Sequence, residues 1–341
     1  MHIVFASDEG FVRQLTVASG SAVWASRGGG GQLIVHVLDC GITDESWAEY
    51  EAMIKRVAKK ACVDVEVVRH IIDMRRFANF KTWTNGSKAA WARFLIPTLL
   101  ADVDVCLYSD CDMLFVANPR EMLDVFQDSD VFLAGHLDPS PTAVVEGRRY
   151  WQDEGIDEIG YLNSGLLFMN LKAFREANIE GRCFEFAALH PEMEYVDQTT
   201  LNYVCLGHRA FLPDGWGLFL HECHAFKGPI KAMHFAACRC WPWKKCGSFQ
   251  NVAWLNLTRQ EFDFWFEFEK RILGFSLPSA IKQPMRLRVK AACFLMLERF
   301  GNLVRVQIGQ GRFQKIVAAY DVQTLALANA RKVLFNDSEG A

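Results

Sequence analysis

Two carboxylates separated by a single residue, Asp110 and Asp112, are the side chains whose type and spacing most directly suggest chemistry. Along an extended backbone, residues i and i+2 point to the same side, and two carboxylates placed there repel each other unless a cation lies between them. Hard divalent ions such as Mn²⁺ and Mg²⁺ prefer oxygen ligands and also bind substrate phosphates. The pair therefore predicts a divalent metal site, and the alternative interpretation is an acidic, exposed turn.

The segment before the pair, residues 103–109, reads VDVCLYS and predicts a buried strand. Upstream of it, apolar runs and amphipathic stretches alternate in the order strand, helix, strand, helix, strand, which is typical of a mainly parallel sheet with helices on both faces. The strands are expected at residues 2–6, 32–39 and 64–72, and the helices at residues 15–26 and 44–61. In open α/β sheets, ligands bind beyond the carboxyl ends of the strands, where the acidic pair is expected.

Further polar residues follow other elements of the same pattern. A helix expected at residues 89–100 carries Arg93, a strand at 165–170 is preceded by Asn163, and Asp197 and Gln198 open another helix. Another strand is expected at residues 131–135. Side-chain amides and carboxylates at strand ends hydrogen-bond sugar hydroxyls. The alternatives are a turn residue for Asn163, a first-turn acid for Asp197 and a salt-bridged helix residue for Arg93.

Five segments together resemble glycosyltransferase family 8, which comprises retaining GT-A enzymes such as bacterial lipopolysaccharide galactosyl- and glucosyltransferases and glycogenin. In chain order they are IVFASD, WARFLIPTLL, LYSDCDMLFVANP, YLNSGLLFMNLKAF and DQTTLN, and the resemblance spans roughly residues 1–245. It implies a GT-A fold, with a Rossmann-like, mainly parallel mixed sheet flanked by helices.

The resemblance also implies an activity. It is the transfer, with retention, of galactose or glucose from a UDP-hexose to a saccharide acceptor such as lipopolysaccharide or lipooligosaccharide core, with Mn²⁺ or Mg²⁺ stabilising the UDP leaving group. The implied roles are uridine contacts for Ala6 and Asp8, a donor contact for Arg93, metal ligation by Asp110, Asp112 and His234, and donor-sugar contacts for Asp138, Asn163, Asp197 and Gln198, the last two at the reacting centre.

The segment after His234 departs from the family pattern, because it lacks a glycine and is one residue longer before Pro242. Arg239, Lys244 or Lys245 are the candidates for the diphosphate contact that the family places there, and guanidinium groups bind phosphate well. A zinc site formed by His234, Cys238, Cys240 and Cys246 is an alternative, although the spacing is irregular for zinc.

Composition narrows the classes of partner. The net charge of -3 gives no global field that favours nucleic acid. Residues 276–320 carry eight basic residues and one acid, hence +7, which leaves -10 for the rest. A basic amphipathic helix there predicts contact with an anionic membrane surface. With no signal-peptide pattern and no long apolar run, we expect a cytoplasmic protein, peripheral on the inner membrane face, whose 11 cysteines are reduced.

Near residue 257 the alternation of expected strands and helices gives way to helices alone. We therefore expect a catalytic domain over residues 1–257 and a basic helical extension over residues 258–341. Helices are expected at 258–273, capped by Thr258 with Glu261 at the capping-box spacing, and at 285–300 and 313–335. Two histidines, His221 and His224, read as ordinary loop residues. Two other functions stay open: a self-glycosylating primer like glycogenin, and a non-catalytic nucleotide-sugar or zinc-binding protein.

Overall fold

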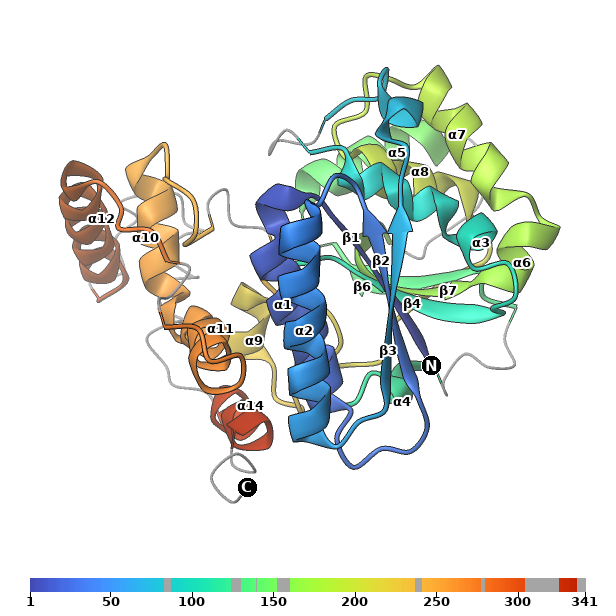
Figure 1. Cartoon of the computed structure of the whole chain (residues 1–341). Coiled ribbons are helices and arrows are strands. Elements are labelled where there is room, and N and C mark those ends of the chain that lie inside the picture. Colours follow the sequence, from blue (N-terminus) through green and yellow to red (C-terminus); the bar gives the residue numbers. More distant parts are fainter. Residues whose placement is uncertain are drawn as a thin grey trace. The chain divides into compact units, whose positions relative to one another are not determined.

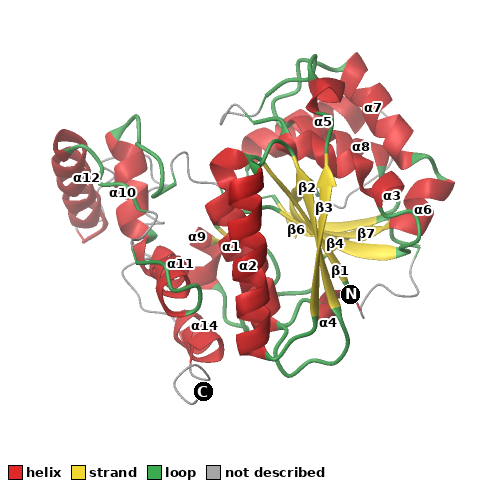
Figure 2. Cartoon of the chain, viewed as in Figure 1, coloured by secondary structure: helices red, strands yellow, loops and turns green. Residues whose placement is uncertain are grey.

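The computed structural model describes residues 1–82, 87–123, 130–138, 140–151, 160–236, 241–276, 280–303 and 325–335. Contacts divide the chain into two compact units, Met1–Gly217 and Leu218–Ala341. The catalytic domain that the sequence predicts over residues 1–257 stays a prediction. Figures 1 and 2 show the helices and strands of both units.

The first unit is built on a mixed sheet of order β3-β2-β1-β4-β7-β6-β8 within the described residues. β1 pairs in parallel with β2 and β4, β2 with β3, and β6 with β8, whereas β7 runs antiparallel to β4 and β6. The predicted GT-A fold class, a mainly parallel sheet flanked by helices, is confirmed. The strands are β1 His2–Ser7, β2 Leu33–Asp39, β3 Val65–Ile71, β4 Val105–Ser109, β6 Leu133–Leu137, β7 Leu162–Asn170 and β8 Arg209–Phe211.

The helices of this unit connect the strands as the alternating pattern requires. They are η1 Glu9–Phe11, α1 Val12–Ala25, α2 Asp44–Ala61, η2 Met74–Phe77, η3 Ala89–Leu95, α3 Ile96–Leu99, α4 Arg120–Leu123, α5 Pro141–Trp151, α6 Leu171–Glu176, α7 Ile179–Leu189 and α8 Val196–Val204. A short strand, β5 Met113–Phe115, contacts α1. α1 and α2 lie side by side in Figure 1.

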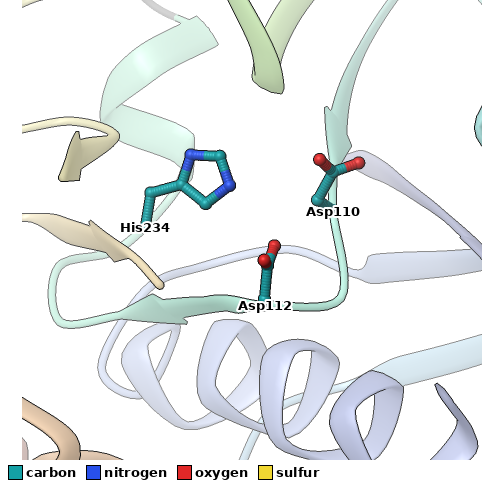
Figure 3. Close-up of side chains that lie close together, drawn as sticks. All are labelled: Asp110, Asp112 and His234. Carbon is teal, nitrogen blue, oxygen red and sulfur yellow. The ribbon is translucent and has the colours of Figure 1, made fainter. Parts of the chain in front are cut away.

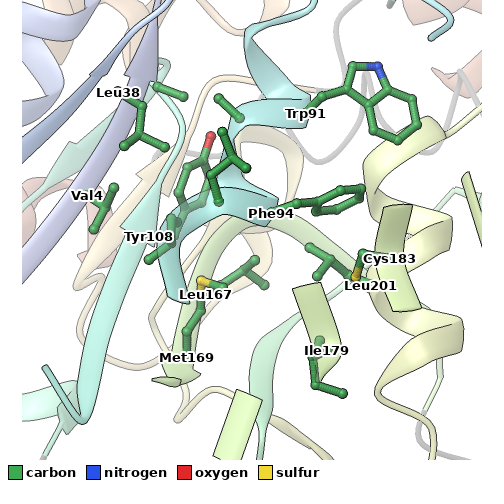
Figure 4. Packing of buried hydrophobic residues seen from close by; sticks show 14 of the residues in the cluster. Val4, Leu38, Trp91, Phe94, Tyr108, Leu167, Met169, Ile179, Cys183 and Leu201 are labelled. Atoms are coloured by element: carbon green, nitrogen blue, oxygen red, sulfur yellow. The ribbon is translucent and has the colours of Figure 1, made fainter. Parts of the chain in front are cut away.

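One face of the sheet is covered by a continuous apolar cluster, part of which Figure 4 shows. Val4 and Leu38 of the central strands pack there with Phe94 of η3, Ile179 of α7 and Leu201 of α8. Their neighbours along the strands, such as Ile3 and Phe5, are also buried but point to the opposite face, since strand side chains alternate. Burial on both faces fixes the register of the strands, and with it the place where each strand ends.

The predicted helix at residues 89–100 differs from the structure. Residues Ala89–Leu95 form a 3₁₀ helix, and a single α-helical turn, Ile96–Leu99, follows. Pro97 has no backbone N–H, so it cannot donate the hydrogen bond that a continuous α-helix would direct to the carbonyl of Arg93. Arg93 nevertheless lies on a buried helical segment, as predicted.

A row of three histidines crosses β1, β2 and β3. His2 Nδ1 lies 2.9 Å from His36 Nε2, and His36 Nδ1 lies 3.0 Å from His70 Nε2, with the rings stacked. Burial, and then the neighbouring His70 and His2, lower the pKa of His36 to about 3. The row is therefore held neutral near pH 7.

The second unit contains a pair of parallel strands and a group of helices. Its described elements are β9 Leu218–Phe219, α9 Leu220–Ala225, β10 Ala232–His234, α10 Phe249–Leu257, α11 Arg259–Arg271, α12 Met285–Leu303 and α14 Leu325–Phe335. α10 packs against α12 through a small apolar cluster, and the two lie side by side in Figure 1. The basic helical extension predicted over residues 258–341 stays a prediction. Among the described residues, we find no helix that combines the length and the hydrophobicity required of a membrane span.

Two details of this unit differ from the sequence-based expectation. Thr258 does not cap α11, because its hydroxyl donates to the Trp254 carbonyl at 3.0 Å. Glu261 is fully buried, and its Oε1 lies 2.5 Å from Nδ1 of His224. Burial raises the pKa of this carboxyl group. His224 is therefore a core residue of α9 and not a loop histidine.

Candidate active site

The acidic pair lies just beyond the carboxyl end of β4. The backbone N–H of Asp110 donates to the Gly165 carbonyl at 2.7 Å, which extends the pairing of β4 with β7 by one residue. Cys111, between the two acids, is buried and donates from Sγ to the Ala6 carbonyl at 3.3 Å. Asp112 is only 7% exposed, so the alternative of an exposed turn is wrong.

His234, the last residue of β10, lies close to both acids. Asp110, Asp112 and His234 each offer one ligand atom, and these atoms lie within 4.8 Å of one another. Figure 3 shows the three side chains pointing toward one another. His234 is 2% exposed, and its ring stacks on Phe219 with the centroids 5.2 Å apart. Carboxylate and imidazole ligands together are compatible with a divalent metal ion.

Arg93 joins the acidic pair to α8. Its Nη2 donates to Asp110 Oδ1 at 2.9 Å, and its Nη1 lies 3.0 Å from Asp197 Oδ2. The same Nη1 donates to the Ser164 carbonyl at 2.6 Å. The guanidinium is buried and lies over the ring of Tyr108. Burial opposes its charge, but the carboxylate of Asp197, with Tyr108 and Asp110, raises the pKa of Arg93.

Asp197 is a buried carboxylate in the first turn of α8. Its Oδ2 accepts from Ser164 Oγ at 3.1 Å in addition to its contact with Arg93. Burial raises the pKa of Asp197, and the charge of Arg93 opposes that rise. Arg93 therefore holds two acids at once, Asp110 beside β4 and Asp197 on α8.

Gln198 connects α8 to the two neighbouring strands. Its Oε1 accepts from Asn163 Nδ2 and from the Ser164 backbone N–H, both at 3.0 Å. Its Nε2 donates to Asp138 Oδ2 at 2.9 Å, and Asn163 Nδ2 lies 3.2 Å from the same oxygen. The structure therefore brings Asp138, Asn163, Asp197 and Gln198 into one polar network with Arg93 and Asp110.

An irregularity in the pairing of β6 with β7 lies next to Asp138, with the extra residues on β7. The pairing register of β6 with β7 shifts between Gly135 and His136, so that His136 lies opposite Asn163. A Cβ atom at Gly135 would lie 2.9 Å from the Asn163 carbonyl oxygen, a contact that side chains do not tolerate. Glycine thus permits the close approach that brings the two strand ends together.

Three members of the network were missed by sequence reasoning. Ser164 bonds to Arg93, Asp197 and Gln198 through backbone and hydroxyl groups. Tyr108 Oη donates to Asp110 Oδ1 at 2.8 Å. Asn202 of α8 bonds to both the N–H and the carbonyl of Leu162. Only Tyr108 had a local signal, because it lies two residues before Asp110 and thus on the same side of β4.

The region in which Ala6 and Asp8 were predicted to contact uridine is also defined. The Ala6 carbonyl accepts from Cys111, and Asp8 Oδ2 accepts from Ser87 Oγ at 2.6 Å. Ala6 is the penultimate residue of β1 and Asp8 follows the strand, at the same sheet edge as Asp110.

The model of the family described as Glycosyl transferase family 8 matches residues 2–246. The chain belongs to this family. The resemblance drawn from the sequence motifs is thereby confirmed, and the protein is a glycosyltransferase.

Similarity to known proteins extends beyond the family model. A Haemophilus influenzae protein that carries the name glycosyltransferase is 25% identical over 309 residues, which is 85% of this chain and 88% of that protein. General stress protein A of Bacillus subtilis is 24% identical over 227 residues, 63% of this chain and 70% of that protein. The galactosyltransferase LgtC, solved with donor and acceptor sugar analogs, has a TM-score of 0.62 at 23% identity, over 85% of this chain and 100% of LgtC.

In the segment after His234, the structure corrects the prediction that all cysteines are reduced. Arg239, Cys238 and Cys240 lie outside the described residues. Cys246 is disulfide-bonded, so the expectation of reduced thiols fails there. A sulfur already in a disulfide is not the thiolate that zinc requires, which removes Cys246 from the zinc alternative. Among the described residues, eight other cysteines are free thiols, including Cys40, Cys106 and Cys111.

Proposed function

We propose that this family 8 glycosyltransferase moves galactose or glucose from a UDP-hexose to a saccharide acceptor, with retention and with Mn²⁺ as its metal. The observation that carries the proposal is the convergence of Asp110, Asp112 and His234. A divalent ion bound there would stabilise the negative charge that develops on the departing diphosphate. Mg²⁺ is the second choice of metal.

Two residues fix the first metal ligand. Asp110 Oδ1 already accepts from Arg93 and from Tyr108. These two bonds orient the carboxylate, in the way that outer-shell hydrogen bonds support metal ligands. Asp112 and His234 are almost completely buried, which restricts the positions open to their side chains.

The donor sugar would be recognised by Asp138, Asn163, Asp197 and Gln198, and the uridine by Ala6 and Asp8. Arg93 contributes by holding Asp110 and Asp197, and Arg239 remains our candidate for the diphosphate contact. Gln198 Oε1 already accepts two N–H groups, which makes this oxygen a poor nucleophile. We therefore favour attack of the acceptor hydroxyl on the face that the diphosphate leaves, with the diphosphate oxygen taking the proton.

A panel of UDP-hexoses with Mn²⁺ tests this proposal. UDP release from UDP-galactose or UDP-glucose is expected, and an added oligosaccharide acceptor should raise its rate. The product should keep the anomeric configuration of the donor in its NMR spectrum. No UDP release from any hexose donor, or an inverted product, would overturn the assignment. Mass spectrometry during turnover should find no glycosylated protein; an adduct on Asp197 or Gln198 would instead support a covalent route.

We further propose that the acceptor is a glycolipid, such as lipopolysaccharide core, reached at the inner face of a membrane through residues 276–320. One face of α12 packs against α10 through Leu287, Ala291 and Leu295. The other face is exposed and apolar at Met285, Val289 and Met296. Residues four and seven apart share a side of a helix, so these three form one stripe.

Basic residues flank the exposed stripe of α12. Arg286 and Lys290 lie along one border and Arg288 along the other, and all three are exposed. An apolar stripe between cationic borders suits an anionic lipid surface. Co-sedimentation with vesicles containing phosphatidylglycerol is expected and should weaken in Val289→Ser/Met296→Ser. The matched control is Val333→Ser on α14, which is 53% exposed. Equal sedimentation of all three proteins would refute the membrane proposal.

A further inference from the structure

Glu146 of α5 is a buried carboxylate with no role in the proposed chemistry, and it is 6% exposed. Its Oε2 accepts from the backbone N–H of Glu194 at 2.7 Å, and its Oε1 from the N–H of Tyr195 at 3.0 Å. These N–H groups immediately precede α8. The N-cap residue Tyr195 forms no side-chain cap hydrogen bond, so a side chain from another helix takes on the capping function.

A second contact ties Glu146 to the strand that carries Asn163. Thr199 Oγ1 donates to Glu146 Oε1 at 2.5 Å, and Tyr161 Oη lies 2.6 Å from the same Thr199 oxygen. The single hydroxyl proton of Thr199 is used on the carboxylate, so Tyr161 must be the donor in the other bond. Thr199 is fully buried and Tyr161 almost so. The chain Glu146–Thr199–Tyr161 therefore links α5, α8 and the residue before β7.

The linked elements carry the residues that meet the donor sugar in the proposed function. Asp197 and Gln198 lie in the first turn of α8, directly after the two N–H groups that Glu146 binds. Asn163 lies two residues after Tyr161. The bond between Gln198 Oε1 and Asn163 Nδ2, 3.0 Å long, depends on the relative placement of α8 and β7. A carboxylate at a helix N-terminus is also favoured by the helix dipole.

We propose that Glu146 is a positioning residue, which holds the start of α8 against β7 so that Gln198, Asp197 and Asn163 meet the donor sugar in register. It does not touch the donor itself. This inference rests on the proposed function for its catalytic consequence, but not for its structural content.

The kinetic test uses Glu146→Gln, which keeps the shape of the side chain and replaces one acceptor oxygen by a donor facing an N–H group. We expect kcat for UDP-hexose hydrolysis to fall about 10- to 100-fold, as for other small misplacements of a reacting group. The affinity for UDP with Mn²⁺ should not change, because UDP lacks the sugar. The matched control is Glu194→Gln, which removes an exposed carboxylate on the same segment. Equal kcat for the two variants would overturn the proposal.

A pair of substitutions at Thr199 separates positioning from packing. Thr199→Val keeps the volume and removes the hydroxyl, whereas Thr199→Ser keeps the hydroxyl and leaves a small cavity. Positioning by the hydrogen-bonded chain predicts that the serine variant retains kcat and the valine variant loses it. The opposite order, with the serine variant less active, would show that packing alone matters and would refute the proposal.

Backbone amide exchange tests the structural content without any activity. In Glu146→Gln, the amide protons of Glu194 and Tyr195 should exchange faster with solvent than in the wild type, measured by NMR, whereas those of β1 should not change. Unchanged exchange at these two amides would overturn the inference. If the wild type hydrolyses no UDP-hexose, the proposed function fails, and the exchange result still decides the role of Glu146.

Discussion

Arg93→Met is the substitution whose outcome the geometry specifies most fully. Arg93 is buried, and its guanidinium faces Asp110 at 2.9 Å and Asp197 at 3.0 Å. The side chain of Asp197 is only 8% exposed, against 31% for Asp110, so most of the unpaired charge would remain on Asp197. Removing one partner of a buried pair costs about 3–5 kcal/mol. We expect a loss of that size in the free energy of unfolding at about pH 8.

The loss should depend on pH, with a sign that the structure determines. Burial raises the pKa of Asp197 above its unfolded value, and Arg93 opposes that rise. Without Arg93, the pKa of Asp197 in the folded state rises further. As pH rises, Asp197 therefore keeps its proton in the folded variant after it has lost the proton in the unfolded variant. The stability of the variant is greatest below the pKa of Asp197 in the unfolded state and falls by about 1.4 kcal/mol per pH unit as pH rises toward the pKa in the folded state. The variant should therefore be closer to wild type at about pH 5.

Urea unfolding at both pH values measures these differences. Arg93→Met/Asp197→Asn should recover part of the loss at the higher pH, because the buried charge is then absent. The control is Arg75→Met, because Arg75 is 90% exposed and solvent screens its pair with Asp73, so this substitution should change the free energy of unfolding little. A loss in Arg93→Met no larger than in this control, or equal losses at the two pH values, would refute the reasoning.

Three further outcomes follow from the same contacts. Tyr108→Phe removes a hydrogen bond to Asp110, a proposed metal ligand, so calorimetry should show Mn²⁺ affinity weakened about 10-fold; unchanged affinity would contradict the proposed role of Tyr108. His36, hydrogen-bonded to a histidine on each neighbouring strand, has a pKa lowered to about 3, so the unfolded state binds its proton first as pH falls below 6.5. Thermal or urea unfolding should show that stability falls as pH decreases from 6.5 toward the His36 pKa of about 3, by about 2 kcal/mol at pH 5. This loss should be absent in His36→Gln. Asn202→Leu leaves the buried N–H and carbonyl of Leu162 without their partner and should cost more than about 2 kcal/mol in urea unfolding; a smaller cost would mean that water replaces the amide.

The sequence was sufficient where one local pattern decides the structure. Buried strands such as β1 and β4 are short apolar runs, and the place where β4 ends fixes the position of Asp110. The spacing of Asp110 and Asp112 then predicts a shared cation. His234 lies far away in the chain, and no periodicity connects it to the acids. Only the family resemblance predicted His234 as a third ligand, and the structure places it close to Asp110 and Asp112.

The rest depends on contacts between elements that are distant in sequence. Ser164 and Glu146 act through hydrogen bonds to backbone groups of other elements, which leave no pattern in their own neighbourhood. Thr258 and Glu261 have the spacing of a capping box, but the carboxylate of Glu261 contacts the buried His224 instead. A cap that depends on local geometry is thus displaced by a tertiary contact. Pro97 indicated the break after η3, but the helical pattern of residues 89–100 as a whole led to the prediction of one continuous helix.

Binding of Mn²⁺ in the presence of UDP tests the central claim most directly, and electron paramagnetic resonance follows it, because free Mn²⁺ gives a signal that ligation to protein diminishes. Wild-type protein with UDP should remove the free signal at one equivalent, and Asp112→Asn should leave most of it in solution while its circular dichroism stays that of the wild type. Equal loss of free Mn²⁺ in the two proteins would show that the group formed by Asp110, Asp112 and His234 is not the metal site of this glycosyltransferase.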